Sequence, residues 1–225
     1  MPAKIALIVM PRRKEFKKQA YHEQPNSFSK EDQFPGKWRS QVFGNEHPLV
    51  LEVGCGKADF SLGMAARYPN TNFVGVDLKA DRLYHAAINA QERKLENVAW
   101  LRENLLLLEE HFAAGEVAEI WITFPDPFPK SRQAKHRMMN ATFLDVYAAI
   151  LKAGGRIHYK TDNLELFQYS LEEFVCYRNL RFHELTFDLH GENDLPDDVK
   201  IKTAYEQKFL DMGKTINYVS MTLVD

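Results

Sequence analysis

Short apolar runs alternate along the chain with segments in which apolar residues recur every three or four positions. The apolar runs predict strands, and the spaced segments predict amphipathic helices. The expected strands are residues 49–53, 72–77, 97–103, 118–124 and 156–162, and the expected helices are residues 58–68, 80–94, 140–155 and 163–177. Strands that alternate with helices in this order indicate a parallel sheet covered on both faces.

The last part of the chain departs from this alternation. Residues 180–189 and 215–224 are strand-like, with no helix between them as clear as the earlier ones, so we expect an antiparallel pair or two edge strands. The whole pattern predicts an α/β fold: a doubly wound, Rossmann-like, mostly parallel seven-stranded sheet with helices on both faces and an antiparallel C-terminal strand. Such folds bind ligands at the carboxyl ends of their strands.

Local signals mark the ends of some elements. Asn140 is a suitable N-cap for the helix that follows it, and the pair Gly154–Gly155 predicts where that helix stops. Residues 1–40 lack clear periodicity and contain the basic run PRRKEFKK. We therefore expect residues 1–40 to form a basic N-terminal extension, irregular or partly helical, and residues 41–225 to form a single domain.

The composition fits a folded protein of a reducing compartment. Of the 225 residues, 45% are apolar and 12% aromatic, enough for a substantial core. The two cysteines, Cys55 and Cys176, make neither a disulfide framework nor a zinc pattern, which favours the cytoplasm. The early apolar run IALIVM is too short for a signal core or a membrane span, so we expect no membrane association.

Positive charge gathers in two stretches of a chain whose net charge is −2. Residues 1–40 carry nine basic and four acidic side chains, and residues 130–137 carry four basic and no acidic ones. The net charge argues against a generic nucleic-acid binder, but local basic patches bind phosphates. Either run taken alone is equally consistent with a solvated surface.

A glycine turn follows the first expected strand. Gly54 and Gly56 permit a tight turn close to a ligand, and Asp77 ends the second strand, where an acid accepts hydrogen bonds from ribose hydroxyls. A dinucleotide fingerprint has Gly or Ala where Asp59 stands, and this charge would repel a pyrophosphate. S-Adenosylmethionine has no phosphate and carries two positive groups, and Glu52 is placed to reach its ammonium. We therefore favour this cofactor over a merely structural turn or a nicotinamide cofactor.

Two further polar residues follow strands. Asn104 ends the third strand, where Asn commonly lies beside adenine, although Asn also caps loops. Asp126 follows the fourth strand among three prolines, which stiffen the loop at the expected crevice. We interpret Asp126 as a preorganised active-site acid, the alternative being an Asp that caps a turn. The basic run KSRQAKHR that follows suits the phosphates of a nucleic acid on the rim of the crevice.

Ordered motifs from about Trp38 to the C-terminus resemble the bacterial tRNA (guanine-N7-)-methyltransferases. These motifs are EVGCGKADF, GVD, FPDPFPKSRQAKHR, HYKTDN, LFQYSLEEF, DLH and TAYEQKF. The resemblance implies a class I enzyme that transfers a methyl group from S-adenosylmethionine to N7 of a variable-loop guanine in tRNA, releasing S-adenosylhomocysteine. We expect no metal, and either a monomer or a homodimer.

The resemblance also implies roles for individual residues. Asp126 would be the central active-site acid and would itself contact the cofactor. The other implied cofactor contacts are Glu52, Gly54, Gly56, Asp77 and Asn104; the implied substrate contacts are Lys130, Asp162, Thr203, Tyr205 and Glu206; the expected RNA phosphate contacts are Arg132, Lys135 and Arg137. From the residues alone, Asp162 is equally readable as a helix N-cap and Glu206 as a surface charge.

Some positions depart from the family pattern. The family usually has Gly at Ala58 and often Trp at Phe128, and its basic block often has His at Gln133 and Arg at His136. These differences bear on details of cofactor contact and tRNA affinity. The first forty residues match poorly, so the resemblance assigns them no role.

The chemistry of guanine limits what the site must supply. N7 is an unprotonated lone pair in the major groove, so attack on a sulfonium methyl needs no general base. We expect catalysis by positioning and by carboxylates that stabilise the positive charge arriving on the purine and accept hydrogen bonds from N1–H and N2–H. Asp126, Asp162 and Glu206 are the candidates.

Two competing hypotheses stay open at this point. Amino-methyltransferases that act on adenine or glutamine place an Asn/Asp-Pro-Pro-aromatic loop at the same strand end, and Asp126-Pro127-Phe128 lacks the second adjacent proline. A tRNA-binding protein with a degenerate cofactor site would also carry the basic stretches without catalysis.

Overall fold

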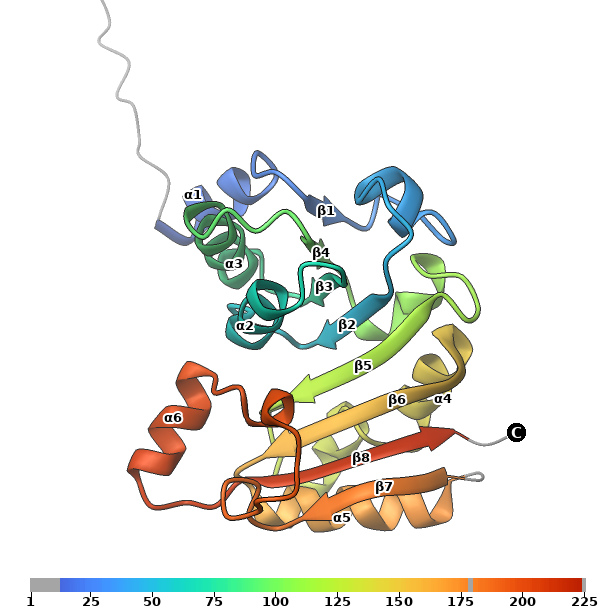
Figure 1. The fold of residues 1–225 in the computed structure, drawn as a ribbon, viewed down its shortest axis with the longest axis vertical. Helices are drawn as coiled ribbons and strands as arrows, with labels where there is room; N and C mark the ends of the chain where they lie inside the picture. Colours follow the sequence, from blue (N-terminus) through green and yellow to red (C-terminus); the bar gives the residue numbers. More distant parts are fainter. Residues whose placement is uncertain (1–12, 178–179, 224–225) are drawn as a thin grey trace, which may run out of the picture.

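The computed structural model describes residues 13–177 and 180–223, which form one eight-stranded sheet with helices on both faces (Figure 1). The strands are β1 (Ser27–Ser29), β2 (Leu49–Val53), β3 (Asn72–Val76), β4 (Val98–Arg102), β5 (Val117–Thr123), β6 (Leu151–Thr161), β7 (Leu180–Thr186) and β8 (Asn217–Leu223). The α-helices are α1 (Arg13–Tyr21), α2 (Asp59–Arg67), α3 (Ala80–Glu92), α4 (Ala141–Ile150), α5 (Leu164–Cys176) and α6 (Ala204–Asp211). Short turns of other helix types are η1 (Trp38–Val42), η2 (Leu105–Glu110), η3 (Ser131–His136) and η4 (Asp197–Lys200).

The order of strands confirms the predicted fold class. The sheet runs β1-β4-β3-β2-β5-β6-β8-β7, and β1 to β6 pair in parallel whereas β8 is antiparallel to both β6 and β7. The chain reverses direction of travel across the sheet between β2 and β5, which are neighbours. That junction is the switch point at which a doubly wound sheet binds its ligand.

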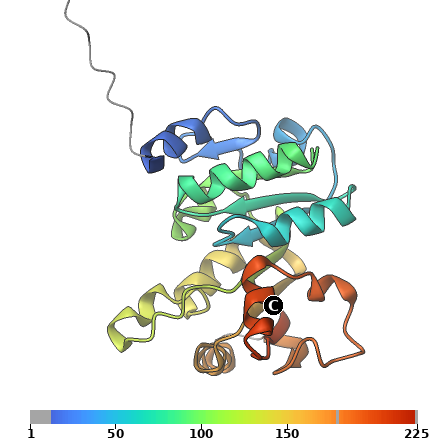
Figure 2. The ribbon, with the colours of Figure 1, turned by 90° about the vertical axis from the view of Figure 1, so that its left-hand side faces the viewer.

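The two faces of the central strands are both buried. Leu51 of β2 belongs to one apolar cluster and Val50 to the other, because successive side chains of a strand point to opposite faces. Helices α2 and α3 cover one face, and α4 and α5 cover the other (Figures 1 and 2). This double burial explains why the strands read as continuous apolar runs rather than as alternating ones.

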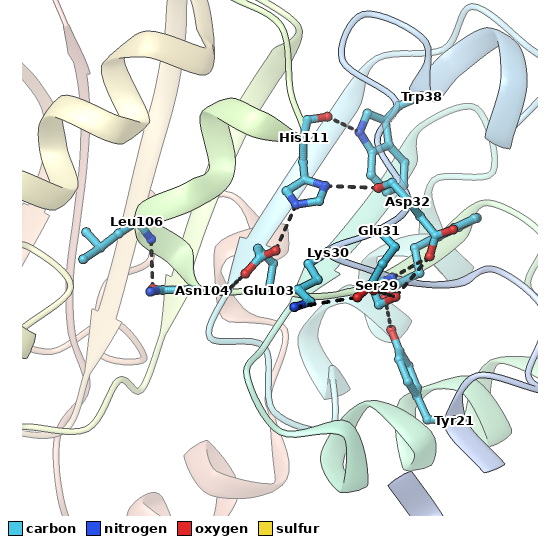
Figure 3. Close-up of polar contacts among 11 residues, drawn as sticks. Tyr21, Ser29, Lys30, Glu31, Asp32, Trp38, Glu103, Asn104, Leu106 and His111 are labelled. Carbon is cyan, nitrogen blue, oxygen red and sulfur yellow. Dashed lines mark hydrogen bonds and ion pairs between the residues drawn. The ribbon is translucent and has the colours of Figure 1, made fainter. Parts of the chain in front are cut away.

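The eighth strand comes from the stretch expected to be an extension. Ser27–Ser29 pairs with β4 at the edge of the sheet, and the Tyr21 hydroxyl donates to the carbonyls of Phe28 and Trp100 at 2.7 and 2.9 Å. Trp38 is fully buried, and its indole N–H donates to the His111 carbonyl at 2.8 Å (Figure 3). The expected domain boundary at residue 40 stays a prediction, and the part of the extension before Arg13 lies outside the described residues.

One predicted helix end was wrong. Asn140 is the N-cap of α4, accepting from the Phe143 amide at 3.2 Å, but α4 ends at Ile150 rather than at the glycine pair. Gly154 and Gly155 instead lie within β6, where the pairing with β5 shifts register. Gly154 has φ +70°, and a Cβ on Gly155 would lie 2.8 Å from the Ala118 carbonyl oxygen, so the glycines serve a bulge in the strand.

The sequence pattern did not distinguish helix α6. This helix lies between β7 and β8 in the sequence, and in space it lies beyond the carboxyl ends of the parallel strands (Figure 1). Across the described ranges, with residues 1–12, 178–179 and 224–225 left aside, no helix is long and apolar enough to span a membrane.

Candidate active site

A cavity of about 590 Å³ opens at the carboxyl ends of β2 and β5. Seven of the fourteen predicted site residues line it. Its lining includes Glu52, Gly54, Gly56, Thr123, Asp126, Asp162, Thr203 and Tyr205. These residues come from four separate regions of the chain, which meet because parallel strands end at one edge of the sheet.

Glu52 forms the buried floor of the cavity. One carboxylate oxygen accepts from the Thr123 hydroxyl at 2.7 Å, and the other accepts from the Ser61 hydroxyl at 2.6 Å and the Ser61 amide at 3.1 Å. Ser61 is in the first turn of α2, so Glu52 satisfies a free amide at the start of that helix. Burial raises the pKa of Glu52 to about 7, although these three hydrogen bonds oppose the shift.

The glycine turn is held open by Asp77. Gly54 and Gly56 have φ of +68° and +60°, the left-handed region that favours glycine. The Asp77 carboxylate accepts from the Gly56 amide at 3.0 Å and from the Lys79 amide at 2.7 Å. Asp77 is buried and is absent from the described lining of the cavity, so its contact with a ribose stays a prediction.

Ala58 begins α2 in a strained conformation. It is the N-cap, with φ +58° and ψ +33°, and it is fully buried. A left-handed backbone explains why glycine is favoured at this position. Its side chain offers no cap, which makes the hydrogen bond from Ser61 to Glu52 the more important for this helix start.

Asn104 caps a turn in the structure. Its side chain accepts from the Leu106 amide at 3.2 Å, and its own amide donates to the Glu103 carboxylate at 2.6 Å (Figure 3). The same buried Glu103 lies 3.1 Å from the ring of His111. The geometry thus matches the loop-capping alternative. Asn104 is exposed just after the carboxyl end of β4, and its role beside adenine stays a prediction.

Asp126 stands on a rigid loop and is exposed. Phe124 and Phe128 on either side of it have φ of +51° and +44°, which is strained for a bulky side chain. The Phe124 amide donates to the Lys160 carbonyl at 2.9 Å, which fixes the start of the loop to β6. Within the part of the chain that the structure describes, no hydrogen bond or ion pair engages the Asp126 carboxylate, so it is available to a ligand.

Arg137 anchors the other end of the proline loop. Its guanidinium donates twice to the Phe128 carbonyl, at 3.3 and 3.1 Å, and lies 4.2 Å from the centre of the Tyr169 ring. It is half-buried, whereas Lys130, Arg132 and Lys135 are exposed. None of these four appears in the described lining of the cavity, so their phosphate contacts stay predictions.

Asp162 lines the cavity on the side of β6. Its carboxylate lies 2.5 Å from the Lys214 ammonium, a contact that the sequence did not suggest. The cap of α5 is the neighbouring Asn163, which accepts from the Leu166 amide at 2.8 Å. The alternative interpretation of Asp162 as the helix N-cap is therefore wrong.

Glu206 is fully buried and points away from solvent, so its interpretation as a surface charge is wrong. One carboxylate oxygen lies 2.8 Å from the ammonium of Lys160, and the other 2.9 Å from the ring of His190. Thr203 caps α6 and forms a reciprocal capping box with Glu206. The sequence did not predict the roles of Lys160 and His190, because nothing local to Glu206 shows that its side chain is buried or that it pairs with distant residues.

The cavity is lined by charges of both signs. Four acidic side chains line it, those of Glu52, Asp59, Asp126 and Asp162, and so do four basic ones, those of Lys57, Arg82, Lys208 and Lys214. Asp59, in the first turn of α2, accepts from the Ala204 amide at 3.1 Å and occupies the place where a pyrophosphate would lie in a dinucleotide site. Among the described residues, no cluster of three or more His, Cys, Asp or Glu side chains could hold a metal ion.

Comparison with known proteins identifies relatives of the whole domain. Residues 46–219 match a family described as a putative methyltransferase. A tRNA (guanine-N(7)-)-methyltransferase of Porphyromonas gingivalis is 42% identical over 196 residues, which cover 86% of this chain and 79% of that protein. Enzymes of the same name from Bacteroides thetaiotaomicron and Lactococcus lactis subsp. cremoris are 41% and 40% identical, over 84% and 81% of this chain and 73% and 83% of their own.

Solved structures share the fold at low identity. A 16S rRNA (adenine(1408)-N(1))-methyltransferase from Catenulisporales acidiphilia superposes with a TM-score of 0.61 at 16% identity, over 86% of this chain and 95% of that one. A geranyl diphosphate methyltransferase has a TM-score of 0.52 at 18% identity, over 79% and 72%. Enzymes with such different substrates share this architecture, so the likeness shows the fold alone.

Proposed function

We propose that this chain, which belongs to the family of tRNA (guanine-N(7)-)-methyltransferases, transfers a methyl group from S-adenosylmethionine to N7 of a variable-loop guanine in tRNA. The observation that carries the proposal is the state of Asp126. It is an exposed carboxylate with no partner among residues 13–177 and 180–223, on a loop with three prolines, and it lines a cavity whose floor is the buried Glu52. An acid so placed is available to a second molecule.

The cofactor half of the cavity fits S-adenosylmethionine. Gly56 leaves room for a ligand against the backbone, because a Cβ there would meet no atom within 4 Å, whereas a Cβ at Gly54 would lie 2.8 Å from the Met138 side chain. Glu52 offers a carboxylate to the ammonium group, and Asp77 and Asn104 flank the strand ends where ribose and adenine bind in this fold. When bound, S-adenosylmethionine supplies an electrophilic methyl group on a positively charged sulfur.

The remaining acids serve the guanine. Because N7 carries no proton, the chain supplies no general base, and it works by orientation and electrostatics. Asp126 accepts hydrogen bonds from N1–H and N2–H and stabilises the positive charge that develops on the purine. Asp162 follows the neighbouring strand β6 and lines the same cavity, where its carboxylate is paired with Lys214.

The rest of the substrate is met by exposed polar groups. Thr203 and Tyr205 both line the cavity; Thr203 is buried at the start of α6, whereas Tyr205 is 61% exposed, which leaves its ring free to contact RNA. Lys130, Arg132 and Lys135 project from the segment after the proline loop and fit the phosphates around the target base. This arrangement places a cation-stabilising cleft beside an anion-binding rim.

Analysis of the methylated nucleoside tests the proposal. Purified protein, tritiated S-adenosylmethionine and mixed tRNA are incubated, and the tRNA is digested to nucleosides. We expect label in N7-methylguanosine, and mapping of undigested tRNA from the same reaction should place it at a single variable-loop position. Label on the exocyclic amine of adenosine would instead support an amino-methyltransferase. Calorimetric binding of tRNA without binding of S-adenosylmethionine would support a non-catalytic tRNA-binding protein.

A further inference from the structure

Helix α6 forms one wall of the cavity, and its one buried member is an acid, Glu206. Ala204, Tyr205 and Lys208 line the cavity and are exposed. An isolated helix of eight residues is not stable in water, so tertiary contacts must hold it. Phe209 and Leu210 supply apolar contacts, because both are partly buried and pack against the core, and polar contacts add to them.

Polar contacts tie α6 to the rest of the site. At its start the Ala204 amide donates to Asp59 of α2, and just beyond its end Lys214 pairs with Asp162. Both of these contacts are exposed to solvent on at least one side. The third contact is the pair Lys160–Glu206, in which both side chains are fully buried.

The Lys160 ammonium contacts two groups, one in α6 and one in the segment that leads into it. This ammonium donates to Glu206 at 2.8 Å and to the Ile201 carbonyl at 3.1 Å, just before the helix. Burial lowers the pKa of Lys160, and the charge of Glu206 opposes that shift. A buried ammonium needs these acceptors, so the strand side chain fixes both the helix and the chain that leads into it.

We propose that Lys160 is a positioning residue, which through its buried contact with Glu206 holds α6 at the distance from the proline loop that the tRNA guanine requires. The inference rests on the proposed function. It assigns Glu206 a structural task behind the cavity instead of contact with the substrate, and it assigns Lys160, on the strand that precedes Asp162, a part in substrate placement.

The test removes the charges as a pair. Lys160→Met/Glu206→Gln keeps the shape of both side chains and leaves no unpaired buried charge between them. Lys152→Met is the matched control, since Lys152 lies on the same strand and is exposed. Three quantities are measured: amide hydrogen exchange of residues 203–211, the Kd for S-adenosylmethionine, and kcat and KM for tRNA methylation.

We expect the double variant to fold, to exchange its α6 amides about tenfold faster, and to bind S-adenosylmethionine within about twofold of the parent. The KM for tRNA should rise by about tenfold or more, because displacement of a wall by about 1 Å is enough to disturb alignment. Lys152→Met should match the parent throughout. A folded double variant with parental exchange in α6, or with parental KM for tRNA, would overturn the inference.

The exchange measurement separates this inference from the proposed function. If the parent protein methylates no tRNA, the proposed function fails, while unchanged protection of α6 in the double variant would still refute the anchoring by Lys160. If the parent methylates tRNA and α6 loosens without any rise in KM, the anchoring holds but the role in substrate placement is refuted. A double variant that does not fold is replaced by Glu206→Gln, for which the same outcomes apply.

Discussion

The two walls of the cavity are built on opposite principles. The backbone geometry of the proline loop and the hydrogen bonds from Arg137 to the Phe128 carbonyl hold the segment that carries Asp126. The Asp126 carboxylate is exposed and has no partner among the residues that the structure describes. Helix α6 is fixed through a carboxylate, that of Glu206, which is buried and fully engaged. We therefore propose that the same chemical group acts on a ligand in one wall and holds the scaffold in the other, according to whether it is exposed or buried.

The largest expected effect comes from removing the exposed acid. Asp126→Ala should lower kcat/KM for tRNA methylation by about two to three orders of magnitude, the cost of losing a preorganised charge near a developing one. The free energy of unfolding should change by no more than about 0.5 kcal/mol, because the side chain is exposed. Activity within a few fold of the parent would remove Asp126 from the mechanism.

Removing the buried acid should chiefly lower the stability of the protein. Glu206→Ala leaves the Lys160 ammonium buried without its main partner, and should lower the free energy of unfolding by about 3–5 kcal/mol. Urea denaturation measures this. The control is Gln207→Ala on the exposed side of the same helix, expected to change stability by less than about 0.5 kcal/mol. Equal effects of the two variants would mean that α6 is not anchored through Glu206.

A third acid, Glu52, is buried like Glu206 and lines the cavity like Asp126, and it should make stability depend on pH. Its pKa is raised from 4.5 to about 7, so the folded protein without ligand favours the protonated form. The resulting stabilisation is present below about pH 4.5 and is lost as the pH rises to about 7, a change of about 3 kcal/mol. Relative to Glu52→Gln, which does not titrate, the parent should lose about this much stability between about pH 5 and about pH 8.

Urea melts of both proteins at several pH values provide the measurement. A constant difference between them would show that Glu52 is not protonated in the free protein. With ligand, the sign reverses: an ammonium favours the charged carboxylate, so affinity for S-adenosylmethionine should rise with pH through about 7 in the parent and not in the variant.

The smallest effects separate the basic residues of the proline segment. Lys130→Gln should leave stability unchanged and reduce the slope of log affinity for tRNA against log salt by about one. Arg137→Gln should lower stability by about 1–2 kcal/mol, because it loses hydrogen bonds to Phe128, and should leave the salt slope unchanged. Filter binding across a salt series distinguishes them. Equal losses of slope would make Arg137 a phosphate contact instead of a clamp.

Local signals in the sequence were enough to predict the fold and to bring several candidate site residues to one edge of the sheet. Glycines 54 and 56, Asp77 and Asp126 all follow apolar runs, and parallel pairing brings strand ends together. The partners of the buried groups were beyond such signals: Lys160 and Glu206 are 46 positions apart, and nothing local shows that a charged helix residue turns inward. For the same reason the contacts of Arg137 with Phe128 and Tyr169 were not predicted, and Arg137 was expected only as an RNA phosphate contact. Strand β1 was missed because it is a three-residue strand in a polar context.

The most direct test of the account is a single-turnover comparison of Asp126→Asn and Glu206→Gln at saturating tRNA and S-adenosylmethionine. Both substitutions preserve shape and remove one charge, so they differ only in where that charge was. We predict that Asp126→Asn slows methyl transfer at saturation by about a hundredfold or more. Glu206→Gln should keep the rate of transfer within about fivefold of the parent and raise the tRNA concentration needed for saturation. Slow transfer in the saturated Glu206→Gln enzyme, with near-parental transfer in Asp126→Asn, would contradict it.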